Sequence, residues 1–128
     1  MTGDDRRYQR VTERVEVDLG AVYESPTLYS LAQIRNLSPG GAFVRSDVLD
    51  EVGTEHILQF SVPSAAHPIA VVGRVVWTKL DPPWHAGMGL QFISMETHDQ
   101  KAINDFVDLV RRARPIEPPH EITPALRN

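Results

Sequence analysis

The stretch Asn-Leu-Ser-Pro-Gly-Gly at positions 36–41 decides how the middle of the chain folds. Pro-Gly and Gly-Gly pairs mark a turn, and glycine lets the backbone come close to a ligand. If the preceding segment is a strand end, Asn36 and Ser38 share one face, because side chains alternate along a strand. An amide and a hydroxyl at that place are suited to a base edge and a phosphate. The stretch is therefore either one half of a binding site or only a hairpin turn.

A second polar stretch, Arg-Arg-Tyr-Gln-Arg at positions 6–10, precedes it. Arginine carries a planar guanidinium that pairs bidentately with phosphate and stacks on flat rings. Arg6, Arg7 and Arg10 could instead form a solvated face that the two preceding aspartates balance. Found together and in this order, the two stretches favour one anion-binding site, suited to a phosphorylated purine.

With these motifs the chain resembles the PilZ domain family, bacterial receptor modules for the second messenger cyclic di-GMP. That family carries RxxxR followed by (D/N)xSxxG, which correspond here to Arg6–Arg10 and Asn36–Gly41. The resemblance covers about residues 6 to 110 and includes further similar segments at positions 52–53, 60–63, 73–77 and 87–92. It implies a mainly β fold, namely a six-stranded antiparallel PilZ-type barrel with a C-terminal helix, and no catalysis.

The resemblance also implies a set of residues that bind cyclic di-GMP: Arg6, Arg7, Arg10, Asn36, Ser38 and Gly41. The first and last arginines would contact phosphates and guanines, and the middle one would add charge or stacking. The asparagine and the serine would bind one guanine and a nearby phosphate. The glycine would keep the turn open.

The composition of the chain argues against several functional classes other than a receptor for a small ligand. The 128 residues suffice for one domain, and the formal net charge is −4. This balance disfavours binding to bulk nucleic acid or an anionic membrane, so a local basic patch indicates a small anionic ligand. The chain has no Cys, which fits a reducing cytoplasm. Because it has neither a signal-peptide core nor a long apolar run, we predict a cytoplasmic protein without a membrane span.

Turn residues separate short segments that alternate between apolar and polar side chains, which is typical of strands. The predicted strands lie at 15–19, 28–35, 42–45, 56–62, 69–78 and 87–93. Short strands and one late helix favour a closed or nearly closed barrel, and Gly73 indicates a bend or bulge. Trp77 is predicted to lie in the barrel core, with a ligand-stacking position, or both roles together, as the alternatives. An exposed Trp84 in its Pro-rich loop would mark a partner contact.

The helix is predicted from a capping box at Thr97 and Gln100. Its apolar stripe has the spacing i, i+3, i+4 and i+7: Ile103, Phe106, Val107 and Val110. Arginines at 111, 112 and 114 suit the negative end of the helix dipole, and Pro115 ends the helix. We therefore divide the chain into a flexible N-terminal arm (1–5), a PilZ-like domain (6–114) and a Pro-rich tail (115–128).

The remaining residues do not indicate an enzyme or a metalloprotein. The five histidines lack metal-ligand spacing, and Ser38 lies in no nucleophile motif. We predict no catalytic residue, no metal site and no cofactor besides the ligand cyclic di-GMP. The predicted protein is a receptor, monomeric or homodimeric, that relays its signal to an unidentified protein effector.

Two alternatives stay open. A PilZ-like protein-interaction module would have the same fold but bind no nucleotide. The acidic balance, and an expected lack of aromatic side chains interleaved with basic strand positions, disfavour an oligonucleotide-binding barrel. We therefore expect no nucleic-acid partner.

Overall fold

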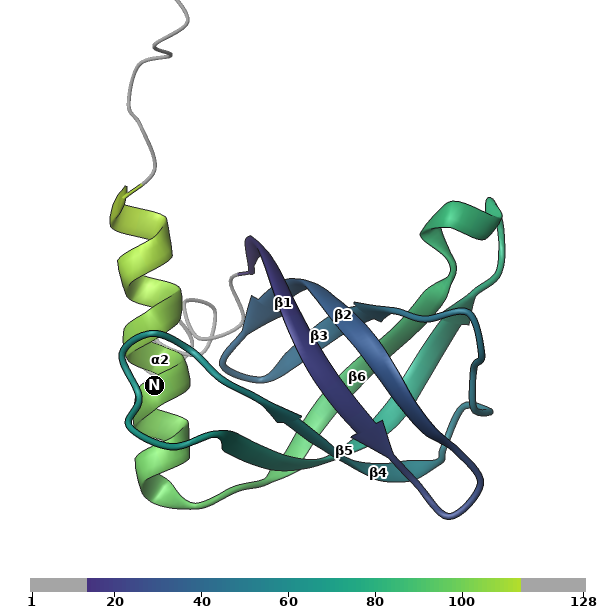
Figure 1. The fold of residues 1–128 in the computed structure, drawn as a ribbon, viewed down its shortest axis with the longest axis horizontal. Helices are drawn as coiled ribbons and strands as arrows, with labels where there is room; N and C mark the ends of the chain where they lie inside the picture. The colour runs from purple at the N-terminus through teal and green to yellow at the C-terminus, as the bar shows by residue number, and fades with distance from the viewer. Residues whose placement is uncertain (1–13, 114–128) are drawn as a thin grey trace, which may run out of the picture.

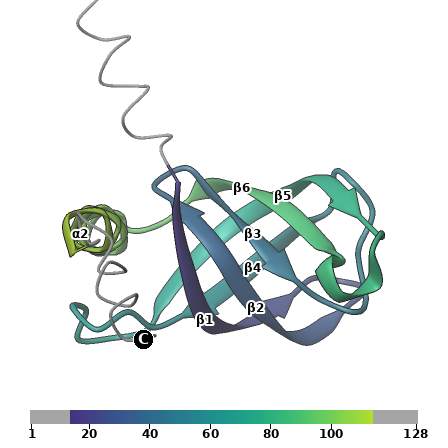
Figure 2. The ribbon, with the colours of Figure 1, turned by 90° about the horizontal axis from the view of Figure 1, so that it is seen from above.

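The computed structural model describes residues 14–113. Over this range, six antiparallel strands close into a barrel in the order β1-β2-β3-β6-β5-β4, and helix α2 packs across one end (Figures 1 and 2). The predicted barrel with a C-terminal helix is confirmed. The elements are β1 (Val15–Glu24), β2 (Tyr29–Ser38), β3 (Gly41–Arg45), β4 (Glu55–Phe60), β5 (Ile69–Lys79), the 3₁₀ turn η1 (Pro83–His85), β6 (Gly87–Ser94) and α2 (Thr97–Ala113).

Several predictions concern residues outside this range. The flexible arm (1–5), the three arginines at positions 6–10, Arg114 and the Pro-rich tail (115–128) all lie outside the described residues. In the described part, neither helical segment is long and apolar enough to cross a membrane.

Strand β5 shows how alternation builds the barrel. Ile69, Val71, Gly73 and Val75 are buried, whereas the alternate residues Ala70, Val72 and Arg74 are exposed. The pairing of β5 with β6 shifts register at Gly73, so the predicted irregularity is confirmed. A second register shift lies between Val75 and Trp77, and it ends the simple alternation before the strand ends.

Helix α2 closes the end of the barrel with its apolar stripe. Ile103, Phe106 and Val107 are buried against the barrel core, and Val110 packs against it partly buried, as predicted. The main-chain carbonyl of Glu96 accepts the first helical hydrogen bond, from the N–H of Gln100 at 3.0 Å. The residue at the N-cap position is therefore Glu96.

The predicted capping box is wrong, because Thr97 is already the first residue of the helix. The side chain of Gln100 does not reach back to the helix start. It donates instead to Asn104 at 3.2 Å, one turn further along.

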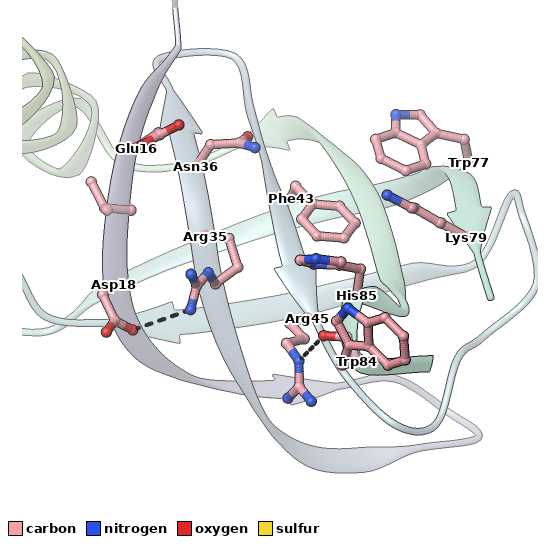
Figure 3. Close-up of a pocket in the computed structure, with 11 residues that line it drawn as sticks. Glu16, Asp18, Arg35, Asn36, Phe43, Arg45, Trp77, Lys79, Trp84 and His85 are labelled. Atoms are coloured by element: carbon pink, nitrogen blue, oxygen red, sulfur yellow. Dashed lines mark hydrogen bonds and ion pairs between the residues drawn. The ribbon is translucent and has the colours of Figure 1, made fainter. Parts of the chain in front are cut away.

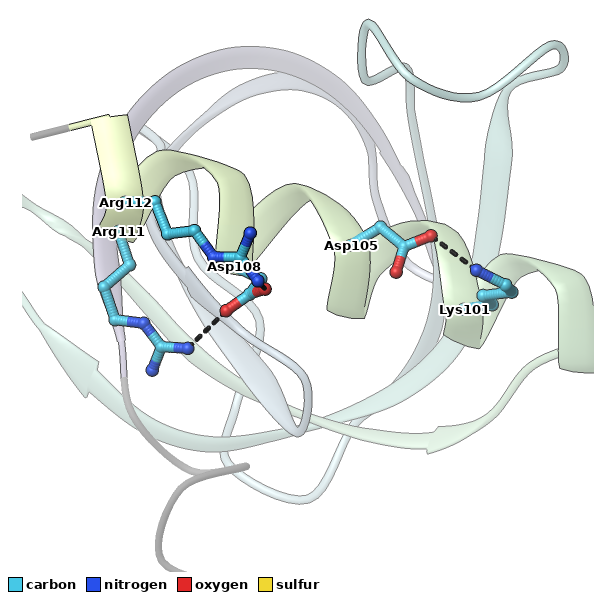
Figure 4. Close-up of polar contacts among 5 residues, drawn as sticks. All are labelled: Lys101, Asp105, Asp108, Arg111 and Arg112. Atoms are coloured by element: carbon cyan, nitrogen blue, oxygen red, sulfur yellow. Dashed lines mark hydrogen bonds and ion pairs between the residues drawn. The ribbon is translucent and has the colours of Figure 1, made fainter.

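Ion pairs cover the outer face of α2 (Figure 4). Lys101 lies 2.7 Å from Asp105, and Asp108 contacts Arg111 at 2.5 Å and Arg112 at 2.6 Å. The hydrogen bond from Arg111 is the main reason why the pKa of Asp108 is lowered. Because these pairs are largely exposed to solvent, each contributes little to stability. The two arginines occupy the last turn, where positive charge is favourable.

A polar cluster links β1 to the loop after β3. Asp50 accepts hydrogen bonds from the hydroxyls of Tyr23 at 2.7 Å, Ser25 at 2.6 Å and Thr27 at 2.8 Å. Burial alone would raise the pKa of Asp50, but these hydrogen bonds outweigh it and lower that pKa. The Tyr23 ring stacks on His56 with 4.7 Å between centroids. Burial also lowers the pKa of His56, whose ring nitrogens have no hydrogen-bond partner among residues 14–113.

We expect the free energy of unfolding to fall as the pH drops below about 6.5, the ordinary pKa of histidine. The unfolded chain then binds a proton at His56 that the folded chain takes up only at lower pH, so acid favours unfolding. Urea denaturation at pH 7.5 and 5.5 measures the difference. His56→Leu should reduce it, whereas His67→Gln, at an exposed histidine, should leave it unchanged. If the free energy of unfolding depended on pH equally in His56→Leu and His67→Gln, His56 would not be the cause of the pH dependence.

Candidate functional site

Strand pairing places residues that are far apart in the sequence in one row on the outside of the barrel. The row consists of Glu16 (β1), Asn36 (β2), Phe43 (β3), Gly89 (β6) and Trp77 (β5). Figure 3 shows the side chains of Glu16, Asn36, Phe43 and Trp77 in this order across the strands. The row brings an amide next to two aromatic rings.

Phe43 and Trp77 form an aromatic platform on the outer surface. Their ring centroids lie 5.3 Å apart and their planes differ by 9°. Trp77 is 37% exposed, so its predicted place in the core is wrong. The register shift before Trp77 turns its side chain outward, which leaves the alternative of a stacking position.

Two glycines of β6 make room for this platform. A Cβ atom on Gly89 would lie 2.2 Å from the Trp77 ring, and one on Gly87 would lie 2.6 Å from the Phe43 ring. The rings therefore lie directly on the backbone of β6. The glycines at 87 and 89, which lie on the same side of the strand, were the sequence signal that large side chains pack against its backbone.

The platform lines a groove of about 730 Å³ (Figure 3). Its other lining residues are charged, polar or aromatic, apart from Val17: Glu16, Asp18, Arg35, Asn36, Arg45, Lys79, Trp84 and His85. Asp18 lies 4.0 Å from Arg35 and also accepts a hydrogen bond from Gln33. Among residues 14–113, Arg45 and Lys79 have no carboxylate partner. The groove therefore has an end with unpaired positive charge.

Ser38 and Gly41 line a neighbouring hollow, of about 710 Å³, between the 38–41 turn and helix α2. The Ser38 hydroxyl donates to the Gly41 carbonyl and accepts from the Gly40 N–H, both at 3.3 Å. Asn36 and Ser38 lie at the end of β2, as predicted, but they face different cavities. Arg14 links the two cavities. It lines the hollow, and it donates a hydrogen bond at 3.4 Å to the side-chain oxygen of Asn36, which lines the groove.

Gly41 is needed for strand packing. A Cβ atom there would lie 2.4 Å from the backbone oxygen of Leu90 on β6. Gly41 does not have a positive φ, and it is the first residue of β3. The close approach of β3 to β6 therefore explains this glycine better than the openness of the turn.

The structure brings together only part of the predicted set. Asn36 lies in the groove, whereas Ser38 and Gly41 lie beside it, and the three arginines at 6–10 lie outside the described residues. Sequence reasoning did not assign the other groove residues to the ligand site, apart from Trp77 as a stacking alternative, and it had interpreted Trp84 as a partner contact. The unassigned residues include the aromatic and basic ones Phe43, Arg45, Lys79 and His85. Alternation from the glycine turn could have placed Phe43 and Arg45 outward with Asn36. The expected lack of aromatic side chains interleaved with basic strand positions is wrong, because Phe43 and Arg45 on β3, and Trp77 and Lys79 on β5, line the same groove.

One group in the described part offers metal-ligand atoms close together, at the start of α2. Ligand atoms of Glu96, His98 and Asp99 lie within 4.8 Å of one another. The His98 Nε2 atom is 3.4 Å from both carboxylates, and Asp99 also accepts from the Ala70 N–H at 3.3 Å. These contacts and the positive end of the helix dipole account for the two acids without an ion.

Comparison with known proteins gives a family and a fold. The family model for the PilZ domain matches residues 4–109. The inhibitor of motility from Bacillus subtilis (MotI/DgrA) is similar in structure, with a TM-score of 0.68 and 20% identity over 80% of this chain and 50% of that one. The PilZ domain of CeSA from a cellulose-synthesizing bacterium has a TM-score of 0.60 and 11% identity, covering 77% of this chain and 98% of that one.

A third similar structure is the Borreliella burgdorferi PlzA protein in complex with cyclic di-GMP. Its TM-score is 0.59 and its identity is 20%, over 83% of this chain and 45% of that one. The chain thus spans about half the length of MotI/DgrA and of PlzA. None of the curated protein sequences matches it.

Proposed function

Because this chain belongs to the PilZ domain family, we propose that it is a bacterial cyclic di-GMP receptor that relays the signal to a protein effector. The observation that carries the proposal is the outer row, in which the motif residue Asn36 lies in one groove with the Phe43–Trp77 platform. A planar base needs both a stacking surface and a hydrogen-bonding edge. The complex of the similar PlzA protein with cyclic di-GMP supports the choice of ligand.

The groove offers the three interactions that a cyclic dinucleotide requires. A guanine stacked on the platform gains about 1–3 kcal/mol. The Asn36 amide supplies a donor and an acceptor for the base edge. Charge-assisted hydrogen bonds to phosphate contribute roughly 1.5–3 kcal/mol each, and Arg6, Arg7 and Arg10 are the proposed donors. Stacking, hydrogen bonds and charge serve recognition, so the proposal includes no catalysis.

Ser38 and Gly41 have a supporting role in this proposal. The Ser38 hydroxyl already holds the turn through two hydrogen bonds, and Gly41 lets β3 approach β6. Together they fix the end of β2 from which Asn36 projects. We further propose that the receptor acts in the cytoplasm, as a monomer or homodimer, through contact with its effector.

Titration calorimetry of the folded protein with cyclic di-GMP tests the function. We expect saturable binding with a Kd of about 1 μM or lower, equivalent to about −8 kcal/mol. Cyclic di-AMP should bind more weakly, because it presents a different base edge to Asn36. Absence of binding by the folded protein would overturn the receptor proposal and favour an interaction module that binds no nucleotide.

We expect Asn36→Asp to tighten the binding of cyclic di-GMP by about 5- to 10-fold. A carboxylate accepts two guanine N–H bonds at once, whereas the amide oxygen has its own NH₂ group beside it. Calorimetry measures the change, and Gln59→Glu, at an exposed position on β4, adds the same charge away from the groove. Equal affinities of the Asn36→Asp variant and the wild type would contradict the proposed contact.

A further inference from the structure

Trp84 is exposed, although the backbone that carries it is fixed. It lies in η1, between β5 and β6, and its side chain is among the exposed ones at 65%. Its carbonyl oxygen accepts a hydrogen bond from Arg45 Nε at 2.7 Å. On either side, His85 N–H donates to Pro82 at 2.8 Å, and the Ala86 oxygen accepts from Ser46 N–H at 3.1 Å. A ring held out by a fixed backbone loses little conformational freedom when it binds.

The indole belongs to the same groove as Asn36 and the platform. Trp84 and His85 both line it, and their rings lie 6.3 Å apart at an angle of 56°. In Figure 3 they lie beside Arg45, away from the end formed by Glu16 and Asn36. The groove thus has two separate aromatic surfaces, the platform and Trp84.

The unpaired positive charge lies at the Trp84 end. Arg45 uses its Nε to hold the Trp84 carbonyl, which leaves its terminal nitrogens available for an anion. Within the described residues, neither Arg45 nor Lys79 has a carboxylate partner, whereas Arg35 has Asp18 beside it. A phosphate is therefore attracted to the Arg45 and Lys79 end, and a base joined to that phosphate comes close to Trp84.

We propose that Trp84 is a second base-stacking surface of the groove, which takes the second guanine of a cyclic dinucleotide whose first guanine lies on the Phe43–Trp77 platform. Arg45 would bind a phosphate between the two guanines. Through its hydrogen bond to the Trp84 carbonyl, it would also hold the loop that carries Trp84. The inference rests on the proposed function and adds a means of distinguishing a two-base ligand from a mononucleotide. It also assigns this exposed Trp to the ligand instead of to a protein partner.

Calorimetry with Trp84→Ala tests this role. We expect the affinity for cyclic di-GMP to fall about 5- to 150-fold, the value of one stacked base. Binding of GMP, whose single base can lie on either aromatic surface, should fall less than binding of cyclic di-GMP, and Trp84→Phe should restore most of the affinity. Leu80→Ala, at a residue of the same loop that is 68% exposed and does not line the groove, is the matched control and should bind like the wild type.

Fluorescence gives a second, independent measurement, because the chain contains two Trp residues. In Trp77→Phe, which keeps an aromatic ring in the platform, all indole emission comes from Trp84. We expect cyclic di-GMP to quench this emission with the midpoint found by calorimetry. If wild-type binding is intact but Trp84→Ala binds equally well, or the emission is unaffected by bound ligand, the inference is overturned and the receptor function stands. If the wild type shows no binding, both fall.

Discussion

Replacement of both Arg6 and Arg10 by alanine is expected to weaken cyclic di-GMP binding by about 10²- to 10⁴-fold. Each arginine is proposed to donate charge-assisted hydrogen bonds to the ligand, each worth roughly 1.5–3 kcal/mol, and loss of two such contacts gives a change of this size. The groove itself keeps Asn36 and the platform in this variant, so the loss isolates what the RxxxR motif contributes. Titration calorimetry on the purified, folded variant measures it.

A matched control removes the same charge at a distance from the groove. Lys101 and Arg112 lie on the outer face of α2, where each pairs with an aspartate (Figure 4). Their double replacement by alanine should leave the affinity within about a factor of two, because neither residue lines the groove or the neighbouring hollow and salt screens exposed charges. A similar loss in both double variants would show a general effect of net charge. No loss in either would exclude the motif from the binding site.

Gly41→Ala is expected to lower the free energy of unfolding by about 2–4 kcal/mol. The added Cβ would lie 2.4 Å from the Leu90 oxygen, and this neighbour is backbone that is paired with β3. The clash therefore separates two strands instead of moving one flexible side chain. Urea denaturation measures the change, at a pH above 7 where His56 is neutral in both states.

The preceding residue supplies the control. A Cβ atom on Gly40 meets nothing within 4 Å, and its φ is not positive. Gly40→Ala should therefore be neutral or stabilise the protein by up to about 1 kcal/mol, because alanine restricts the unfolded chain. Equal effects at the two positions would mean that the turn, not the approach of β3 to β6, requires the glycine. If Gly41→Ala destabilises the protein as predicted, it should also weaken ligand binding, because the packing of β3 against β6 is damaged.

The sequence predicted the elements whose signal is local. Alternation identified the strands, and the spacing of Ile103, Phe106 and Val107 identified the buried face of α2, because each depends only on a few neighbouring residues. Trp77 was misplaced because its direction is set by a register shift in the pairing of β5 with β6. That pairing depends on residues at 87–94, which no periodicity within β5 can reveal.

The candidate site was predictable to a similar extent. Asn36 stood out because a motif surrounds it, and in the structure it is one of the residues that line the groove. Phe43 and Trp77 become neighbours only when β6 lies between β3 and β5. Arg45 and Trp84 meet through a main-chain oxygen, which no side-chain pattern encodes. The part that was missed is therefore the part created by contacts between distant segments.

The strand order β1-β2-β3-β6-β5-β4 has a consequence for the growing chain. The row that forms the groove crosses β6, which comes last in sequence among the six barrel strands, so a nascent chain that ends before residue 94 has no complete platform. Ligand that binds only the finished barrel stabilises it by mass action, by about 2.7 kcal/mol at a hundredfold excess over Kd. Under the proposed function, the cellular level of cyclic di-GMP influences how much of the folded protein survives proteolysis, in addition to how much of it is occupied.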